Sequence, residues 1–407
     1  MKRRAKIVFL FLLSLLCASG RLYAQDQTDA QILAEGNNMF ALDLYGQLQK
    51  ASGNLFFSPY SISSALAMTY VGASGQTASQ MADVLHFELD ETYLHNAFSE
   101  LMTGLDADPQ EDAYQLSIAN ALWAQMDYEF YDDFINITKN YYNAGFEEVD
   151  FVDDVEREAA RQKINLWVED KTDNKIKDLI AKDTLDALTR LVLTNAIYFK
   201  GNWASRFDPA NTQDRPFTLS NGREVEVPMM KQQQEFNYSA NDMLQVLEMP
   251  YDGQALSMVI ILPKEVDGLE EVEGSFTIED LEDWLAPLRK REVSVSMPKF
   301  KMSDEFLLGD ALKTLGMRDA FSSKSADFSK MAPDPVGLYI SSVIHKAFVE
   351  VNEEGTEAAA ATAVTMKIRG MPEPAPVFKA DHPFIFVIRD IHSESILFIG
   401  RVMDPRD

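Results

Sequence analysis

Side chains able to carry catalytic or metal-binding chemistry are few and scattered in this chain of 407 residues. The motifs G-x-S-x-G, G-x-G-x-x-G and H-E-x-x-H are absent, and so is a phosphate loop. The 64 acidic residues make close carboxylate pairs a matter of chance. The sequence therefore predicts that the chain is not an enzyme and holds no cofactor. No metal-ligand spacing occurs among the five histidines, His86, His95, His345, His382 and His392.

An unusual run, residues 355–368, follows a predicted strand and precedes a proline-rich tail. It has no proline and mostly alanine and threonine, and its local propensity favours a helix or a flexible linker because Ala and Glu form helices well. A strand is the alternative. In a strand, every second residue points to the same face, and one of the two sets of alternating residues is entirely small or apolar, as a buried sheet face requires. That set is Thr356, Ala358, Ala360, Thr362, Val364 and Met366. The other set holds both charges and is Glu357, Ala359, Ala361, Ala363, Thr365 and Lys367.

Motifs in four separated places resemble the inhibitory type of the serpin family of serine protease inhibitors. The places are residues 345–347 with 353–362, residues 381–386 with 396–402, residues 54–62, and residues 193–203. The resemblance runs from about residue 30 to residue 405. It implies an α+β serpin fold with three β-sheets, about eight to nine helices and an exposed reactive-centre loop at about residues 353–378.

The resemblance implies that this loop is bait for a protease. Cleavage would let the loop insert as a new central strand of the largest sheet, dragging the covalently bound protease along. An inserting strand needs free backbone N–H groups and small side chains, and the first proline after the hinge is Pro372. The hinge that the family pattern indicates consists of Glu353, Gly355, Thr356, Glu357, Ala358, Ala359, Ala360, Ala361 and Thr362.

The reactive bond is placed by the same resemblance. In inhibitory serpins the residue before the cut bond lies at a fixed offset from the hinge glutamate, and the seventeenth residue counted from Glu353 is Arg369. The bond from Arg369 to Gly370 suits a trypsin-like protease, because a carboxylate in the protease pocket pairs with a guanidinium. A small shift of register would instead select Met366 or Lys367, and Met366 would suit an apolar pocket.

The expected partner is therefore a trypsin-like serine protease, held covalently by a monomeric inhibitor. Cysteine proteases stay open as further targets. A second class of function is a non-inhibitory serpin that binds a ligand or a folding client. Such proteins often carry bulky, charged or proline residues in the hinge, whereas this hinge is made of small residues. The sequence therefore favours inhibition.

Four polar residues are expected beneath the large sheet, in what the family resemblance implies is the shutter region. Ser58 and Ser61 would lie there, and Asn195 and His345 would join their hydrogen bonds. Ser58 also suits a helix N-cap, because a proline follows it at the first helical position. Without the resemblance, a single buried histidine is usually structural. The expected role is conformational rather than catalytic.

The family resemblance implies three residues where the loop enters the sheet, a region called the breach. Trp203 would lie at the entry point, and Lys299 would pair with Glu353 at the base of the loop. The alternative interpretation of Lys299 is a solvated charge that contributes less than ~1 kcal/mol.

The N-terminal residues 1–24 have the pattern of a secretory signal. A basic start precedes an apolar run, residues 7–16, that is too short to span a bilayer. Cleavage after Ala24 would leave a single domain, residues 25–407, secreted and without cysteine. Cys17 is the only cysteine, and lipid anchoring through it is a minor alternative because the bulky Leu16 precedes it.

The mature chain would be strongly acidic. Removing residues 1–24 takes away five basic and no acidic residues, which changes the net charge from −27 to −32. Such a surface disfavours nucleic acid, polyanions and anionic membranes as partners.

Apolar periodicity predicts helices at residues 30–49, 59–70, 76–87, 91–105, 131–142, 154–172 and 304–315, and long strands at 114–125, 188–200, 293–300 and 338–352.

Overall fold

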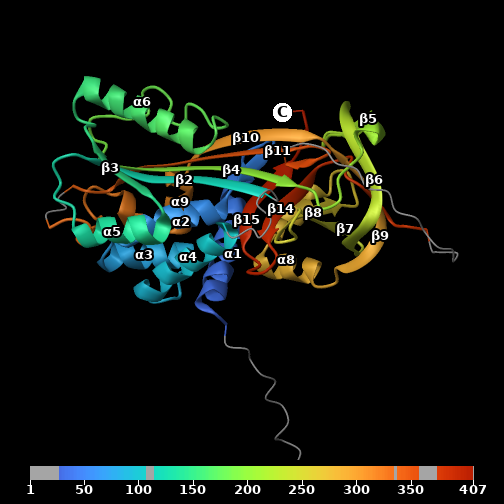
Figure 1. The fold of residues 1–407 in the computed structure, drawn as a ribbon, viewed down its shortest axis with the longest axis horizontal. Coiled ribbons are helices and arrows are strands. Elements are labelled where there is room, and N and C mark those ends of the chain that lie inside the picture. Colours follow the sequence, from blue (N-terminus) through green and yellow to red (C-terminus); the bar gives the residue numbers. More distant parts are fainter. Residues whose placement is uncertain (1–26, 107–113, 334–336, 357–373, 407) are drawn as a thin grey trace, which may run out of the picture.

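The computed structural model describes residues 27–106, 114–333, 337–356 and 374–406, which form nine α-helices and two hydrogen-bonded sheets (Figure 1). A six-stranded sheet runs across the molecule, with helices α1 to α5 below it and helix α6 above it. A nine-stranded sheet fills the other end of the molecule. Among the described residues, no helix combines the length and the apolar character that crossing a bilayer requires.

Several helices begin at residues whose side chains satisfy the first backbone N–H groups. At α1 the Thr28 hydroxyl accepts from the N–H of Gln31, and the Gln31 side chain accepts from the N–H of Thr28. At α2 the Ser58 hydroxyl accepts from the N–H of Ser61, and Pro59 occupies the first helical position, as the sequence predicts. The helices below the sheet are α1 (Asp29–Leu48), α2 (Pro59–Tyr70), α3 (Gly75–Leu85), α4 (Glu91–Asp106) and α5 (Asp132–Tyr142).

The six-stranded sheet has the order β10, β11, β4, β2, β3, and the short strand β12 pairs with β4. Strands β11 and β4 are parallel neighbours, whereas β10 pairs antiparallel with β11 and β2 pairs antiparallel with β4. The bounds are β2 (Tyr114–Gln125), β3 (Gly145–Val149), β4 (Leu191–Asn202), β10 (Phe300–Leu307), β11 (Ile340–Val351) and β12 (Gly355–Thr356).

The nine-stranded sheet has the order β1, β15, β14, β8, β7, β6, β9, β13, with β5 paired to β6. The long strand β6 connects the two halves of this sheet, because successive segments of β6 pair with β5, β9 and β7. Helices α7 (Leu269–Gly274) and α8 (Ile278–Leu285) also belong to this end of the molecule. The bounds are β1 (Leu55–Phe57), β5 (Gln213–Thr218), β6 (Glu224–Ala240), β7 (Leu244–Pro250), β8 (Leu256–Pro263), β9 (Arg289–Pro298), β13 (Val377–Lys379), β14 (Phe384–Asp390) and β15 (Ile396–Val402).

One predicted helix is shorter than expected. The sequence predicts a helix at residues 304–315, but residues 304–307 extend strand β10, and α9 (Gly309–Leu315) begins only after them. Tertiary pairing decides this, because β10 stays in register with β11 as far as Leu307 opposite Ile344. The apolar residues Phe300, Met302 and Phe306 belong to one alternating set of positions, which has the period of a strand, and Asp304 is the polar member of that set.

Two hydrophobic clusters lie on the two faces of the six-stranded sheet. The larger one fills the inner face, between this sheet, the nine-stranded sheet and the helices below. The smaller one lies on the outer face, under α6 (Asp154–Lys171) and the segment that follows it. Both faces of β4 are buried as a result, which explains its nearly continuous apolar sequence.

Candidate functional site

A new strand begins at one end of the boundary between β11 and β4. These two strands pair in parallel until Phe348 lies opposite Tyr198, and each then continues beyond that pair. The chain leaves β11, turns back, and pairs antiparallel with the end of β4, where Gly355 lies opposite Asn202. The first two residues after this turn therefore already extend the six-stranded sheet. This sheet is the smaller of the two hydrogen-bonded sheets, whereas the resemblance implies a new strand in the largest one.

The turn depends on a glycine. Backbone hydrogen bonds join Asn352 and Gly355, with N···O distances of 2.8 and 3.3 Å. Gly355 has a φ of +143°, and a Cβ at this position would lie 2.1 Å from the carbonyl oxygen of Gly201. A side chain is therefore excluded both by the backbone conformation and by the close approach of β4.

Trp203, which the resemblance predicts at the entry point of the loop, is hydrogen bonded to this turn. Its indole Nε1 donates to the carbonyl of Asn352 at 3.0 Å, and its backbone N–H donates to the carbonyl of Glu354 at 2.8 Å. The indole is buried and stacks on Tyr251, with ring centroids 4.7 Å apart. Phe207 adds a third bond, from its N–H to the carbonyl of Glu353 at 2.8 Å.

Glu353 is fixed at the base of the turn by two side chains. Lys299 Nζ lies 2.8 Å from Oε2, and the Thr212 hydroxyl donates to Oε1 at 2.8 Å. Glu353 is only 8% exposed, so its carboxylate is largely shielded from water. Burial raises the pKa of its carboxyl, but the bonds from Lys299 and Thr212 outweigh burial and hold the pKa below its usual range. Sequence reasoning missed Thr212, which carries no motif.

Replacing Thr212 by valine is expected to destabilise the intact protein by about 1–3 kcal/mol, because a buried carboxylate loses a donor. Thermal or urea unfolding of Thr212→Val, Glu353→Gln and the double variant would measure this, with coupling of about 1 kcal/mol expected. Strictly additive effects would show that the hydroxyl does not hold the carboxylate.

A row of buried polar side chains crosses the inner face of the sheet at mid-height. His345 on β11 lies opposite Asn195 on β4, and Asn195 lies opposite Asn120 on β2. The three are hydrogen bonded in that order along the row. Asn195 also donates to the carbonyl of Ser61 at 3.0 Å, which ties the row to helix α2. The row therefore spans the boundary between β11 and β4.

Ser58 connects this row to the second sheet. Its backbone N–H donates to Nε2 of His345 at 3.1 Å, and its hydroxyl donates to the carbonyl of Leu397 on β15 at 2.6 Å. Nε2 of His345 is thus an acceptor, and Nδ1 carries the proton that Asn195 accepts. Burial lowers the pKa of His345 to about 3, so the ring is neutral at physiological pH. The four predicted shutter residues are brought together here.

Asn120 is the member of the row that sequence reasoning missed. A signal for it was present, because Asn120 is the polar position in the alternating set Leu116, Ile118, Asn120, Leu122 of β2. A buried polar residue in an apolar strand face needs hydrogen-bond partners, and Asn195 supplies one.

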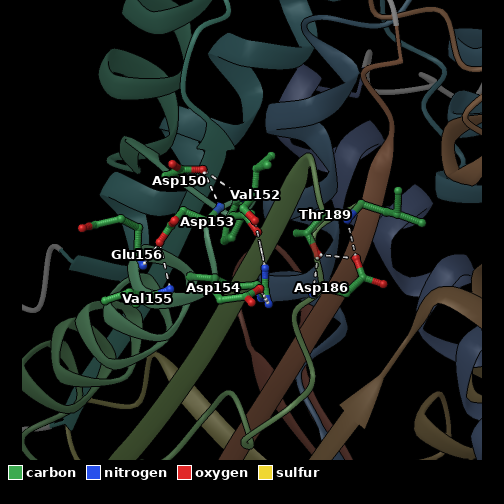
Figure 2. A network of polar contacts seen from close by, with 11 residues as sticks. Asp150, Val152, Asp153, Asp154, Val155, Glu156, Asp186 and Thr189 are labelled. Carbon is green, nitrogen blue, oxygen red and sulfur yellow. Dashed lines mark hydrogen bonds and ion pairs between the residues drawn. The ribbon is translucent and has the colours of Figure 1, made fainter.

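Helix α6 lies on the outer face of the same sheet, where it packs against β2 and β3. Figure 2 shows how its start is fixed: Asp150 accepts from the N–H of Val152 at 2.8 Å, and Asp153 caps the helix by accepting from Val155 and Glu156. The outer hydrophobic cluster also includes the segment that follows α6, together with side chains of both β4 and β11. Lys175 of that segment lies over the rings of Tyr198 on β4 and Phe348 on β11, with Nζ 5.6 and 5.9 Å from the ring centroids. A strand added between β4 and β11 would have to displace this segment, since its contacts bridge the two strands.

The end of the predicted loop is described and runs into strand β13, where Phe378 lies opposite Val295 of β9. Residues 357–373 of the loop lie outside the described residues. They include the positions Glu357, Ala358, Ala359, Ala360, Ala361 and Thr362 of the hinge, Met366, Lys367, Arg369 and Gly370. The signal segment with Cys17 lies outside them too. Within the described part of the chain, no cluster of three or more potential metal ligands occurs.

The model of the family described as Serpin (serine protease inhibitor) matches residues 35–405 of the chain. The chain belongs to the serpin family. The human leukocyte elastase inhibitor is 43% identical to this serpin over 384 residues, which cover 92% of this chain and 99% of the relative. An uncharacterised serpin-like protein of Thermococcus kodakarensis is 45% identical over 372 residues, which cover 91% of this chain and 85% of the relative.

Solved structures confirm the serpin fold that the sequence predicts. Uncleaved ovalbumin matches with a TM-score of 0.82 and 30% identity, covering 92% of this chain and all of the other. Human thyroxine-binding globulin, solved with its ligand, matches with a TM-score of 0.84 and 32% identity, covering 93% of this chain and 100% of the other. This serpin thus has relatives whose names describe protease inhibition and one whose name describes ligand binding.

Proposed function

We propose that this serpin is a suicide-substrate inhibitor of trypsin-like serine proteases, cut between Arg369 and Gly370. The observation that carries the proposal is strand β12, which already pairs with β4 and forms the start of the strand that an inhibitory loop must add. The sequence beyond β12 supplies small side chains and no proline before Pro372. The leukocyte elastase inhibitors among the relatives support a protease as the target.

The chemistry would belong to the protease. Its nucleophile would attack the carbonyl carbon of Arg369, the bond to Gly370 would break, and the new amino terminus would leave with a proton. Arg369 would then remain on the protease as an ester. Insertion of the freed loop between β4 and β11 would drag the protease along and distort its oxyanion site before water could release the ester.

The proposed target class rests on the charge of Arg369, because a protease pocket that holds a carboxylate selects a guanidinium. Met366 and Lys367 are the alternative sites within the same loop. Cleavage after Lys367 would keep the trypsin-like class, whereas cleavage after Met366 would indicate an apolar pocket. Mass spectrometry of the cleaved loop identifies the bond directly.

Mixing the protein with trypsin is expected to give a covalent complex that survives a denaturing gel. Arg369→Ala should slow complex formation by on the order of 100-fold or more, because the protease pocket then holds an unpaired carboxylate. Lys367→Ala is the matched control, since it removes a positive charge from the same loop and should inhibit like the parent. Plain cleavage without a complex, or an unchanged rate in Arg369→Ala, would contradict the proposed site.

Export is a separate proposal, supported by the basic start and the apolar run of residues 1–24. N-terminal sequencing of the protein from the culture medium or periplasm of an expressing host would test it. A mature chain that begins shortly after Ala24 is expected, and an intact Met1 in the cell interior would contradict export.

A further inference from the structure

A half-buried acidic residue, Asp304, belongs to the alternating set of β10 that faces the apolar inner side of the six-stranded sheet. It lies on the edge strand β10 between Met302 and Phe306 and opposite Ala347 of β11. The backbone N–H of Phe56 on β1 donates to its carboxylate. Asp304 therefore connects the edge of the six-stranded sheet to the edge strand of the other sheet.

The second oxygen of this carboxylate has no partner. Oδ2 of Asp304 is buried and accepts no hydrogen bond within the described part of the chain. The residues of β1 carry no charge, and the titratable group that β11 presents on this face is the neutral His345. Glu305 lies on the opposite face of β10, where it pairs with Lys346 at 3.1 Å. Burial thus raises the pKa of Asp304 to about 6.

Asp304 lies close to residues of the predicted shutter. Strand β1 continues directly into Ser58, whose N–H binds His345. Phe306, two positions after Asp304, stacks on the His345 ring and meets Phe57 edge to face, with centroids 6.4 Å apart in both pairs. Packed rings therefore connect the part of β10 that holds Asp304 to the residue that bridges β11 and β4.

We propose that the ionised Asp304 carboxylate favours opening of the sheet at the shutter and that its protonation holds the sheet closed. An unpaired buried charge gains hydration when the structure around it opens, whereas a neutral carboxyl gains far less. Because burial favours the protonated form, the closed state is most stable at low pH and loses stability as pH rises through about 6. This inference concerns the control of the insertion step, and in that sense it rests on the proposed function.

The first test needs no protease. Intact protein is melted at pH values from 5 to 8 as the parent, as Asp304→Asn, and as the control Glu350→Gln, which removes a carboxylate from the outer face of β11. The melting temperature of the parent should fall relative to that of Asp304→Asn as the pH rises through 6. Glu350→Gln should follow the parent at every pH.

The second test measures opening itself, as the rate at which a synthetic peptide with the sequence of residues 356–367 enters the sheet and raises the melting temperature. The parent should take up this peptide on the order of tenfold faster at pH 8 than at pH 5. Asp304→Asn should be slow at both pH values, and Asp304→Glu, which keeps a titratable group, should restore the pH dependence.

An Asp304→Asn variant with the pH profile of the parent in both tests would overturn the inference. Should Asp304→Asn fail to fold, Asp304→Glu decides, because its longer side chain should shift the midpoint of the pH profile, and an unmoved midpoint contradicts the inference. A peptide that never enters the sheet of any variant would count against the proposed function instead, while the melting curves would still decide the role of Asp304.

Discussion

Cutting the loop at one bond is expected to raise the melting temperature of this serpin by about 20 °C or more. Ten or so residues that join the sheet beyond β12 would each gain a net hydrogen-bond contribution of about 1 kcal/mol. Their sum is on the order of 10 kcal/mol, which rivals the whole stability of an ordinary domain. In a chain of this size each kcal/mol shifts the melting temperature by roughly 2 °C.

The measurement is a melting curve before and after nicking, with the nicked bond identified by mass spectrometry. A native state that stays metastable until it is cut is kinetically trapped, so heating rates must be matched between samples. An unchanged melting temperature would show that the cut loop stays outside the sheet. That result would contradict inhibition by insertion and would favour the ligand-binding type of serpin.

Replacing Thr356 by arginine is expected to turn the inhibitor into a substrate. Thr356 occupies the position opposite Gly201, which belongs to the same alternating set of β4 as Phe199, Ile197 and Asn195. Residues opposite each other in a sheet share a face, so this position is on the inner, apolar face. A guanidinium there must be desolvated without a partner, which costs several kcal/mol and slows insertion.

The effect is measured by mixing trypsin with increasing amounts of the variant. The residual trypsin activity is then determined, and the products are separated on a denaturing gel. The number of inhibitor molecules consumed per trapped protease should rise by on the order of tenfold or more. Glu357→Arg is the matched control, because the next position belongs to the other alternating set and already carries a charge. Normal inhibition by Thr356→Arg would show that the assignment of the two sets to the two faces is wrong.

The two predictions are linked through one variant. Nicked Thr356→Arg should melt close to its intact form, because the charge that blocks trapping of the protease also blocks insertion. A large rise in melting temperature in that variant would separate insertion from inhibition. It would show that the loop enters the sheet too slowly to trap a protease but still enters it.

Local signals were sufficient for much of the fold. Ser58 and Pro59 fix the start of α2, and the predicted helix at residues 59–70 has the observed bounds, because a cap and a first-turn proline act within a few residues. Strand β2 also has its predicted bounds, because a continuous run of side chains there favours a strand. The local preference of residues 355–356 for a helix or linker was overridden by pairing with β4.

The sequence by itself determined the family, the composition of the hinge and the candidates for the reactive bond, because these depend on residue types at short spacing. Only the tertiary structure decided which distant side chains meet. Thr212 binds Glu353 across 141 positions, and Asn120 binds Asn195 across 75. The burial of Asp304 arises likewise from strand pairing, because no local pattern encodes the neighbours that a sheet brings together.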